Sequence, residues 1–321
     1  MADLKKNYEE IKGEMHSKLV WCGENSHYAL FKGNRIQLTR NRSKYDVIVN
    51  HIGTTKRIEI TCIGQVELEK LYLLLGEIRQ FEYLFEGAFF LMRECLVDDE
   101  DITAVIQEVE LGYFQSSKYL HEIPVVLTDA EYKKYFLRWV KLARKRAIIN
   151  QMILYASNVN GITSDVRLAM LAESFNMLAK KMEKENLLSI IPEPDTYSKI
   201  TCQHCGQLNS KRIKGRKTLS CCLNSVIGQY GMPVFSTEYR RRKSLITHIV
   251  KTRNKVFHVD SGKRGYLSGG QCGFYSVKLD WMYRYVCLIQ IGIDKTILDN
   301  AISKKIRNCS GQYLALAARY V

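Results

Sequence analysis

Proline is scarce in this sequence and long hydrophobic runs are missing, and these absences exclude several classes of protein. The 321 residues include only 4 prolines and 20 glycines, too few for a collagen-like or low-complexity chain. The apolar stretches, such as residues 71–75, end far short of the roughly 20 residues that a membrane-spanning helix needs. Residues 1–12 are too acidic for a signal peptide. We therefore expect a cytoplasmic protein that does not enter a membrane.

Charge is distributed unevenly along the chain. The formal net charge is +15, yet residues 1–127 carry 15 basic against 20 acidic residues, whereas residues 128–321 carry 33 against 13. A strongly basic half favours a polyanionic partner, most often nucleic acid, although a solvated surface or an acidic protein partner would give the same count. The two parts are therefore expected to have different electrostatic roles.

Residues 1–127 have the pattern of a β-rich α+β domain. β-branched and aromatic residues concentrate in short segments, which predicts strands over residues 28–31, 36–39, 45–51, 58–63 and 89–97. Leu68, Leu71 and Leu75 share one face of an expected helix over residues 66–80. No catalytic spacing occurs in this part, so we expect it to be a regulatory or sensing domain.

Residues 128–321 are expected to form an all-α helical bundle, which makes the chain an α+β protein of two domains. Thr128 is a suitable N-cap for the first helix. The expected helices cover residues 130–156 with a break near Leu142, then 164–185, 219–230, 237–257, 277–291 and 295–307. Residues 191–217 contain Pro192, Pro194 and a basic run, and are expected to be a loop.

Arg253, Asn254 and His258 are the strongest catalytic candidates. Asn254 and His258 are four residues apart and share a helical face, and Arg253 converges with them if the helix ends near His258. A guanidinium binds a phosphate through two hydrogen bonds, and an imidazole transfers a proton near neutral pH. These residue types fit cleavage of a phosphodiester, while an ordinary basic helix end is the alternative.

The same residues carry a resemblance to a known family. Arg253, Asn254 and His258 resemble the Arg-x4-6-His motif of HEPN ribonucleases, in which a polar residue commonly follows the arginine. Residues 164–184 resemble the early helix of the ApeA-like HEPN branch, and residues 218–231 resemble the short helix before its motif helix. The order of a β-rich part and a helical domain is also similar to that of the ApeA group of antiviral and toxin-like proteins.

The resemblance implies a metal-independent endoribonuclease that needs no cofactor for catalysis. It also implies a homodimer in which two motif helices face each other at a composite site. There the RNA 2′-hydroxyl would attack the adjacent phosphate, with His258 as general acid or base, Arg253 stabilising negative charge, and Asn254 orienting His258 or the phosphate. The role implied is antiviral defence or toxin-like growth arrest, started by a phage-derived or cellular trigger that the N-terminal domain senses.

Basic residues around the motif predict salt-dependent RNA binding. They are Arg240, Arg241, Arg242 and Lys243 at the other end of the helix, Lys251 and Lys255 within it, and Lys263 and Arg264 after it. Positive charge at a helix N-terminus opposes the helix dipole, so the three arginines favour a ligand-binding role.

A cysteine cluster predicts a structural zinc site. Cys202 and Cys205 have Cys-x2-Cys spacing, and Cys221 and Cys222 follow after a 15-residue gap. Four such ligands bind Zn²⁺ tetrahedrally, although adjacent cysteines on a helix diverge by about 100° and only one joins easily, so that His204 or Cys272 would have to complete the site. Buried or free thiols are the alternative.

Two further functions are open at the level of sequence. A catalytically silent HEPN-like module would bind RNA, a nucleotide or a partner protein through the basic face. A zinc-ribbon protein would instead bind nucleic acid through the segment that the cysteines hold.

Overall fold

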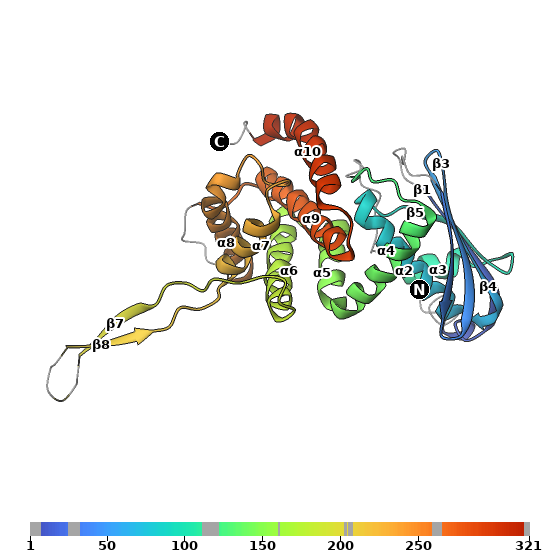
Figure 1. The fold of residues 1–321 in the computed structure, drawn as a ribbon, viewed down its shortest axis with the longest axis horizontal. Helices are drawn as coiled ribbons and strands as arrows, with labels where there is room; N and C mark the ends of the chain where they lie inside the picture. Colours follow the sequence, from blue (N-terminus) through green and yellow to red (C-terminus); the bar gives the residue numbers. More distant parts are fainter. Residues whose placement is uncertain are drawn as a thin grey trace. The chain divides into compact units, whose positions relative to one another are not determined.

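The computed structural model describes residues 8–24, 33–110, 122–159, 161–201, 204, 208–258 and 265–317 (Figure 1). The chain divides into two compact units. Unit 1 consists of residues 1–162 with 280–312, and unit 2 consists of residues 163–279 with 313–321. Each unit is described by itself.

An antiparallel six-stranded sheet forms the framework of unit 1. Its strands lie in the order β2-β3-β4-β1-β5-β6. They are β1 (Met15–Glu24), β2 (Asn34–Arg40), β3 (Ser43–Ile52), β4 (Thr55–Glu67), β5 (Leu91–Val97) and β6 (Glu100–Asp101). Alternate residues such as Val47 on β3 and Ile58 and Ile60 on β4 are buried, so one face of the sheet forms the core. Helix α2 (Leu68–Glu86) packs on the sheet and buries Leu71 and Leu75.

Helices complete the core of unit 1. They are α3 (Thr103–Glu110), α4 (Asp129–Lys145), α5 (Ala147–Asn158), the second half of α9 (Gly269–Ile291), and α10 (Lys295–Ala317). The expected N-cap of α4 is confirmed, because Glu131 N–H donates to Thr128 Oγ1 at 3.3 Å and Thr128 N–H donates to Glu131 Oε2 at 3.0 Å. Residues 278–288 of α9 are buried on every side, which is typical of a central helix.

Unit 2 consists of packed helices and one β-hairpin. Its elements are α6 (Ser164–Lys184), β7 (Thr196–Thr201), β8 (Leu208–Ile213), α7 (Leu219–Tyr230), the short 3₁₀ helix η1 (Tyr239–Arg241), α8 (Arg242–His258) and the first half of α9. Helix α6 packs against both α7 and α8. The β7–β8 hairpin extends away from these helices (Figure 1).

The α+β class is confirmed, but several elements differ from expectation. The strand expected at residues 28–31 lies outside the described residues. Strand β1 was not expected, because Leu19, Val20 and Trp21 are buried in succession and give no alternating pattern. Residues 191–217 were expected to be a loop and instead contain the β7–β8 hairpin, whose strands are too polar to give a strand signal.

Helix boundaries also moved. The chain breaks between α4 and α5 at Arg146 and not near Leu142, α8 begins at Arg242 after η1, and α9 begins at Gly269 in spite of its glycines. The compact units do not coincide with the expected ranges 1–127 and 128–321, because α4 packs on β2 and α2 and so belongs to unit 1. A compact packing unit need not be a functional domain. The division into functional domains at 1–127 and 128–321 therefore stays a prediction.

Within the described part of the chain, every helix is too short or too polar to span a membrane.

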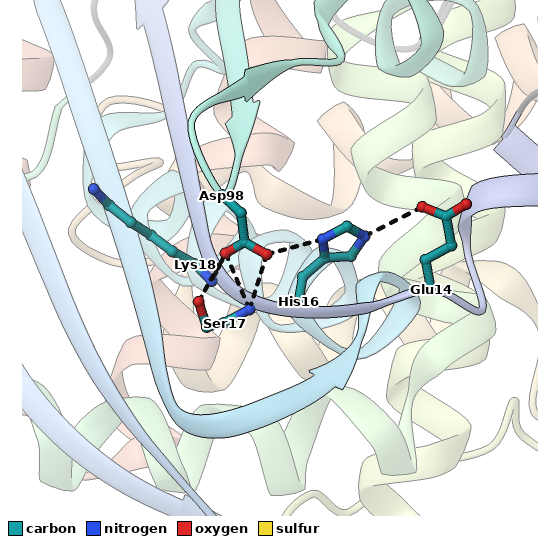
Figure 2. A network of polar contacts seen from close by, with 5 residues as sticks. All are labelled: Glu14, His16, Ser17, Lys18 and Asp98. Carbon is teal, nitrogen blue, oxygen red and sulfur yellow. Dashed lines mark hydrogen bonds and ion pairs between the residues drawn. The ribbon is translucent and has the colours of Figure 1, made fainter.

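A carboxylate anchors the turn between β5 and β6 to a bulge in β1 (Figure 2). Asp98 Oδ1 accepts hydrogen bonds from Ser17 N–H at 3.1 Å, Lys18 N–H at 2.9 Å and Ser17 Oγ at 2.8 Å, and Asp98 Oδ2 lies 3.0 Å from His16 Nδ1. The Ser17 hydroxyl donates to the carboxylate and not to the imidazole. The group is therefore a turn anchor, because an activated nucleophile would need a serine–histidine contact.

The charge state of Asp98 matters for this anchor. Burial by itself would raise the pKa of Asp98, but the hydrogen bonds from Ser17, His16 and Lys18 outweigh it and lower the pKa below its ordinary value of 3.8. A carboxyl group with a lowered pKa stabilises the fold above its unfolded pKa, and this stabilisation is lost as the pH falls through the folded pKa.

We expect Asp98→Asn to lower the free energy of unfolding of unit 1 by about 1–2 kcal/mol at pH 7, because several donors lose a charged acceptor. Urea unfolding followed by tryptophan fluorescence measures the change, since Trp21 lies on β1. The difference from wild type should shrink as the pH is lowered below about 4. Asp99→Asn is the matched control, because Asp99 is 82% exposed and its carboxylate lies 3.5 Å from the Lys18 ammonium at the surface. Equal losses in the two variants would contradict this role.

A buried charged cluster lies on the core face of the sheet. Lys56 is in phase with Ile58 and Ile60 on β4, and its ammonium lies 3.1 Å from Glu82 Oε2 and 2.5 Å from the Glu86 carboxylate. His51, which pairs with Lys56 across the β3–β4 ladder, has its Nε2 3.7 Å from both carboxylates. Burial raises the pKa of Glu86 well above its ordinary value. Burial would also raise the pKa of Glu82, but the Lys56 ammonium together with His51 and Tyr132 outweighs it and lowers this pKa. One lysine therefore compensates two acidic groups, one of which holds its proton readily.

We expect Lys56→Met to cost about 3–5 kcal/mol of unfolding free energy at pH 7, because it leaves buried carboxylates without their cation. Urea unfolding measures the loss. Lys70→Met is the control, since Lys70 is 47% exposed and pairs with Glu67 at 3.2 Å on the surface, where such pairs contribute about 0–1 kcal/mol. Replacing Glu82 and Glu86 by glutamine in the Lys56→Met variant should recover part of the loss. A Lys56 variant as stable as the Lys70 variant would contradict the compensating role of Lys56.

Candidate functional site

Helix α8 places Arg253 beside α6. Leu245, Ile246 and Ile249 form the buried face of α8, and Arg253 follows Ile249 by four residues on the edge of that face. The guanidinium therefore lies between the two helices, with the side chain 22% exposed. Partial burial weakens solvent screening around this cation, so its interactions with negative groups are stronger than at an open surface.

Glu173 and Asn254 are among the side chains that hold the Arg253 guanidinium. Arg253 Nη2 donates to Glu173 Oε2 on α6 at 2.9 Å, and Arg253 Nη1 donates to Asn254 Oδ1 at 3.1 Å. Asn176 Nδ2 in turn donates to Glu173 Oε1 at 2.9 Å, and the ring of Phe257 lies 5.2 Å from the guanidinium carbon. The structure thus brings Arg253 and Asn254 together, in a chain of contacts that begins on α6.

His258 is the last residue of α8. The expected helix end at the motif is therefore present, while the side chain of His258 lies outside the part of the structure that is described. Lys263 and Arg264, which we expected to bind RNA, also lie outside the described residues.

The segment that follows the motif returns to α8. Leu267 N–H donates to Thr252 Oγ1 at 3.1 Å, and Lys255 Nζ lies 4.9 Å from the ring of Tyr266. Gly265 has a φ of +93°, and a Cβ there would lie 3.3 Å from Lys251 Nζ. Residues 265–267 therefore lie along the stretch of α8 from Lys251 to Lys255, which contains Asn254 and precedes His258.

The basic residues at the start of α8 fall into two groups. Arg242 is held within the fold, because its Nε donates to Asn224 Oδ1 at 3.2 Å and its guanidinium carbon lies 5.0 Å from the Tyr239 ring. Arg240, Arg241 and Lys243 are exposed. Lys243 precedes Arg253 by ten residues, which corresponds to about 15 Å along a helix. The exposed group fits the expected phosphate contacts better than Arg242 does.

Sequence reasoning missed Glu173. It lies 80 residues before Arg253 and was one of many charged residues on a long helix, so no spacing or motif singled it out. Only the packing of α6 on α8 brings its carboxylate to the guanidinium.

The four cysteines of the expected zinc site are not all described. Cys202 and Cys205 lie outside the described residues. Cys222 is fully buried on α7, and burial raises the pKa of its thiol to about 11, which disfavours the thiolate that zinc requires. Cys221 is half-buried, and its Sγ accepts a hydrogen bond from Thr218 Oγ1 at 3.4 Å. The zinc site stays a prediction.

One group in unit 1 has the composition of a metal site. Ligand atoms of His51, Glu82 and Glu86 lie within 4.8 Å of one another. The Lys56 ammonium already contacts both carboxylates, so a metal ion would have to displace it. The Lys56 contacts therefore favour a structural role for this group.

The comparison with known families identifies the region around Arg253. Residues 161–297 match the family model described as Apea-like HEPN. No curated protein and no solved structure matches the chain. The match contains α6, α7, α8 and α9, and with them Glu173, Arg253, Asn254 and His258. HEPN domains in general have a ribonuclease fold, so the match supports a nuclease role, and the expected resemblance is confirmed. Residues 161–297 are therefore similar to ApeA-like HEPN domains.

Proposed function

We propose that this protein is a metal-independent endoribonuclease of the HEPN type. The observation that supports this most directly is the placement of Arg253: a partly buried guanidinium, fixed by Glu173 and Asn254, at the end of the helix that closes with His258. The family match over residues 161–297 supports the same chemistry.

Arg253 would bind and stabilise the reacting phosphate. A guanidinium donates two parallel hydrogen bonds to phosphate oxygens and keeps its charge at any physiological pH. The ion pair with Glu173 fixes the direction of the guanidinium before RNA binds, which reduces the cost of ordering it in the transition state. Glu173 is therefore proposed as a positioning residue, because it acts through Arg253. An RNA phosphate would share the Arg253 guanidinium with the Glu173 carboxylate.

His258 would move the proton. The 2′-oxygen of the ribose attacks the adjacent phosphorus and loses its proton, the bond from phosphorus to the 5′-oxygen breaks, and the 5′-oxygen gains a proton. The products are a 2′,3′-cyclic phosphate and a 5′-hydroxyl. An imidazole can act as the general acid or base in this transfer, because histidine gains and loses its proton near neutral pH. Asn254 would orient His258 or the phosphate. Because the nucleophile is the 2′-hydroxyl, DNA would bind without being cut.

RNA binding would depend on exposed cations near the motif. Arg240, Arg241 and Lys243 are exposed, and Lys251 and Lys255 belong to the same helix as Arg253. These charges support an affinity for RNA that falls with salt.

The proposal also covers the oligomeric state of the protein and the way its activity is started. The protein would act as a homodimer, and its β-rich N-terminal part would sense a phage-derived or cellular trigger in antiviral defence or toxin-like growth arrest. The difference in charge between residues 1–127 and 128–321 supports separate roles for the two parts.

We expect purified protein to cut RNA in the presence of EDTA and to leave cyclic phosphate ends. Arg253→Ala and His258→Ala should each reduce the rate about 10²–10⁴-fold, because each removes a group that acts in the transition state. Gel analysis of labelled RNA and end-group mapping measure the rate and the products.

The control variant for this experiment replaces another residue of α8. His248→Ala removes a histidine whose Nδ1 lies 2.8 Å from Ser244 O, and it should leave the rate nearly unchanged. Loss of cleavage on chelation, or 3′-hydroxyl products, would contradict the mechanism. RNA binding without any cleavage by the wild-type protein would favour the silent module.

We also expect a two-fold dimer, since each chain supplies one Arg253 and one His258 and the family arrangement uses two facing copies. Light scattering at the concentration of the cleavage assay should give twice the mass of one chain. Mixing Arg253→Ala and His258→Ala proteins tests the composite site, because hybrid dimers would recover part of the activity. A monomer that cleaves RNA at the wild-type rate would contradict this expectation.

A further inference from the structure

The β7–β8 hairpin exposes apolar side chains to solvent. Its two strands pair with each other and form a separate two-stranded sheet in the described structure. Tyr197 is 67% exposed and Ile213 is 45% exposed, and the hairpin extends away from α6, α7 and α8 (Figure 1). An isolated two-stranded ribbon is only marginally stable in water, so its persistence as an exposed element requires another source of order.

That order comes from contacts at the base of the hairpin. Asp195 accepts hydrogen bonds from Gly215 N–H at 2.8 Å and from Arg212 Nε at 2.6 Å, and Glu193 N–H donates to Arg216 O at 3.1 Å. A Cβ on Gly215 would lie 1.6 Å from Glu193 O, so only glycine fits this crossing. The two chain segments are therefore joined at the base, and the hairpin is directed outward from a fixed point.

The strand register places an aromatic ring among cations. Tyr197 pairs directly with Arg212, and Lys199 follows two residues later on the same face of the ribbon. Lys199, Lys214 and Arg216 are also exposed. Lys214 interacts electrostatically with Asp195, while the side chains of Lys199 and Arg216 have no hydrogen bond or ion pair with another described residue. An exposed aromatic surface flanked by available cations is suited to stacking on a base and contacting phosphates at the same time.

Charge indicates what binds this surface. Residues 196–217 contain six basic residues and no acidic residue. The same ribbon of a second copy would carry the same basic residues and be repelled from this surface, whereas a nucleic acid is attracted. The bases of a duplex are already stacked on one another, so an exposed tyrosine favours a single strand.

We infer that the β7–β8 hairpin is a binding arm for single-stranded RNA. Tyr197 stacks on a base, and Lys199, Lys214 and Arg216 contact phosphates. The choice of RNA as the ligand rests on the proposed function. The stacking and the phosphate contacts are inferred from the exposed residues of the hairpin alone. The arm raises the affinity for RNA and takes no part in bond cleavage.

Binding of a labelled 20-nucleotide oligouridine to the full-length His258→Ala protein tests this arm, because that variant should not cut the probe. Replacing Lys199, Lys214 and Arg216 together by alanine should weaken binding and reduce the slope of log affinity against log salt by about 2, since each phosphate contact on a single strand contributes about 0.7. Tyr197→Ala should weaken binding about 5- to 100-fold with little change in slope, and Tyr197→Phe should retain most of the affinity.

A matched charge control lies on α6. Lys180 and Lys184 are exposed in the same unit, and their double replacement by alanine should change the salt slope much less than the hairpin variant does. An RNA duplex of the same length should be insensitive to Tyr197→Ala. Urea midpoints equal to that of the α6 control establish that the variants are folded.

Two results would overturn the inference. One is a hairpin variant that binds oligouridine as tightly as the α6 control. The other is a hairpin variant that changes the oligomeric mass without changing the RNA affinity, which would assign the ribbon to contacts between protein chains. Cleavage by the protein with His258 intact is recorded separately, so arm-dependent binding without any cleavage would contradict the proposed function and leave the arm in place.

Discussion

The ion pair between Glu173 and Arg253 is the interaction on which the geometry of the candidate site depends. It joins α6 to α8 at 2.9 Å and holds the guanidinium at the edge of a buried helix face. Without the carboxylate, the long arginine side chain would lose the contact with α6 that fixes the direction of its charge. Asn254 and the ring of Phe257 restrict the same group from the α8 side. The same pair also limits the site, because an RNA phosphate competes with a carboxylate that is already bound.

Sequence reasoning worked best where a local rule determines the structure. Thr128 and Glu131 form the expected N-cap of α4, and the motif helix ends at His258 as its spacing indicated. It failed where tertiary packing overrides the local pattern. Strand β1 lies between β4 and β5, so successive residues are buried and the alternation of a half-exposed strand disappears. The β7–β8 hairpin was missed for a different reason. Most of its described residues are exposed, and an exposed ribbon has no buried side that would produce an alternating apolar pattern.

The candidate site shows the same division. Arg253 and Asn254 were identified because they are adjacent in a motif, but Glu173 reaches them only through helix packing. Arg242 carries the same charge as its neighbours, but its side chain donates a hydrogen bond to Asn224 on α7. Lys56 in unit 1 occupies an inward-facing strand position that a pattern rule assigns to an apolar residue. In each case the partner is distant in sequence, so the role of the charged residue follows from the three-dimensional structure alone.

The division of unit 1 into two separate stretches has a consequence for synthesis. Its core needs the second half of α9, where Asp280 accepts hydrogen bonds from Tyr83 at 2.5 Å and from Ser157 at 2.9 Å. Chains fold from the N-terminus as they leave the ribosome, so residues 163–279 are made before the helix that fills the core of unit 1 exists. During that interval the sheet and α2 have an incomplete apolar core. The nascent chain would then contain the motif helix in a nearly complete unit 2 while the apolar core of unit 1 is still accessible to chaperones and proteases. A chain truncated before residue 280 would leave that core incomplete permanently.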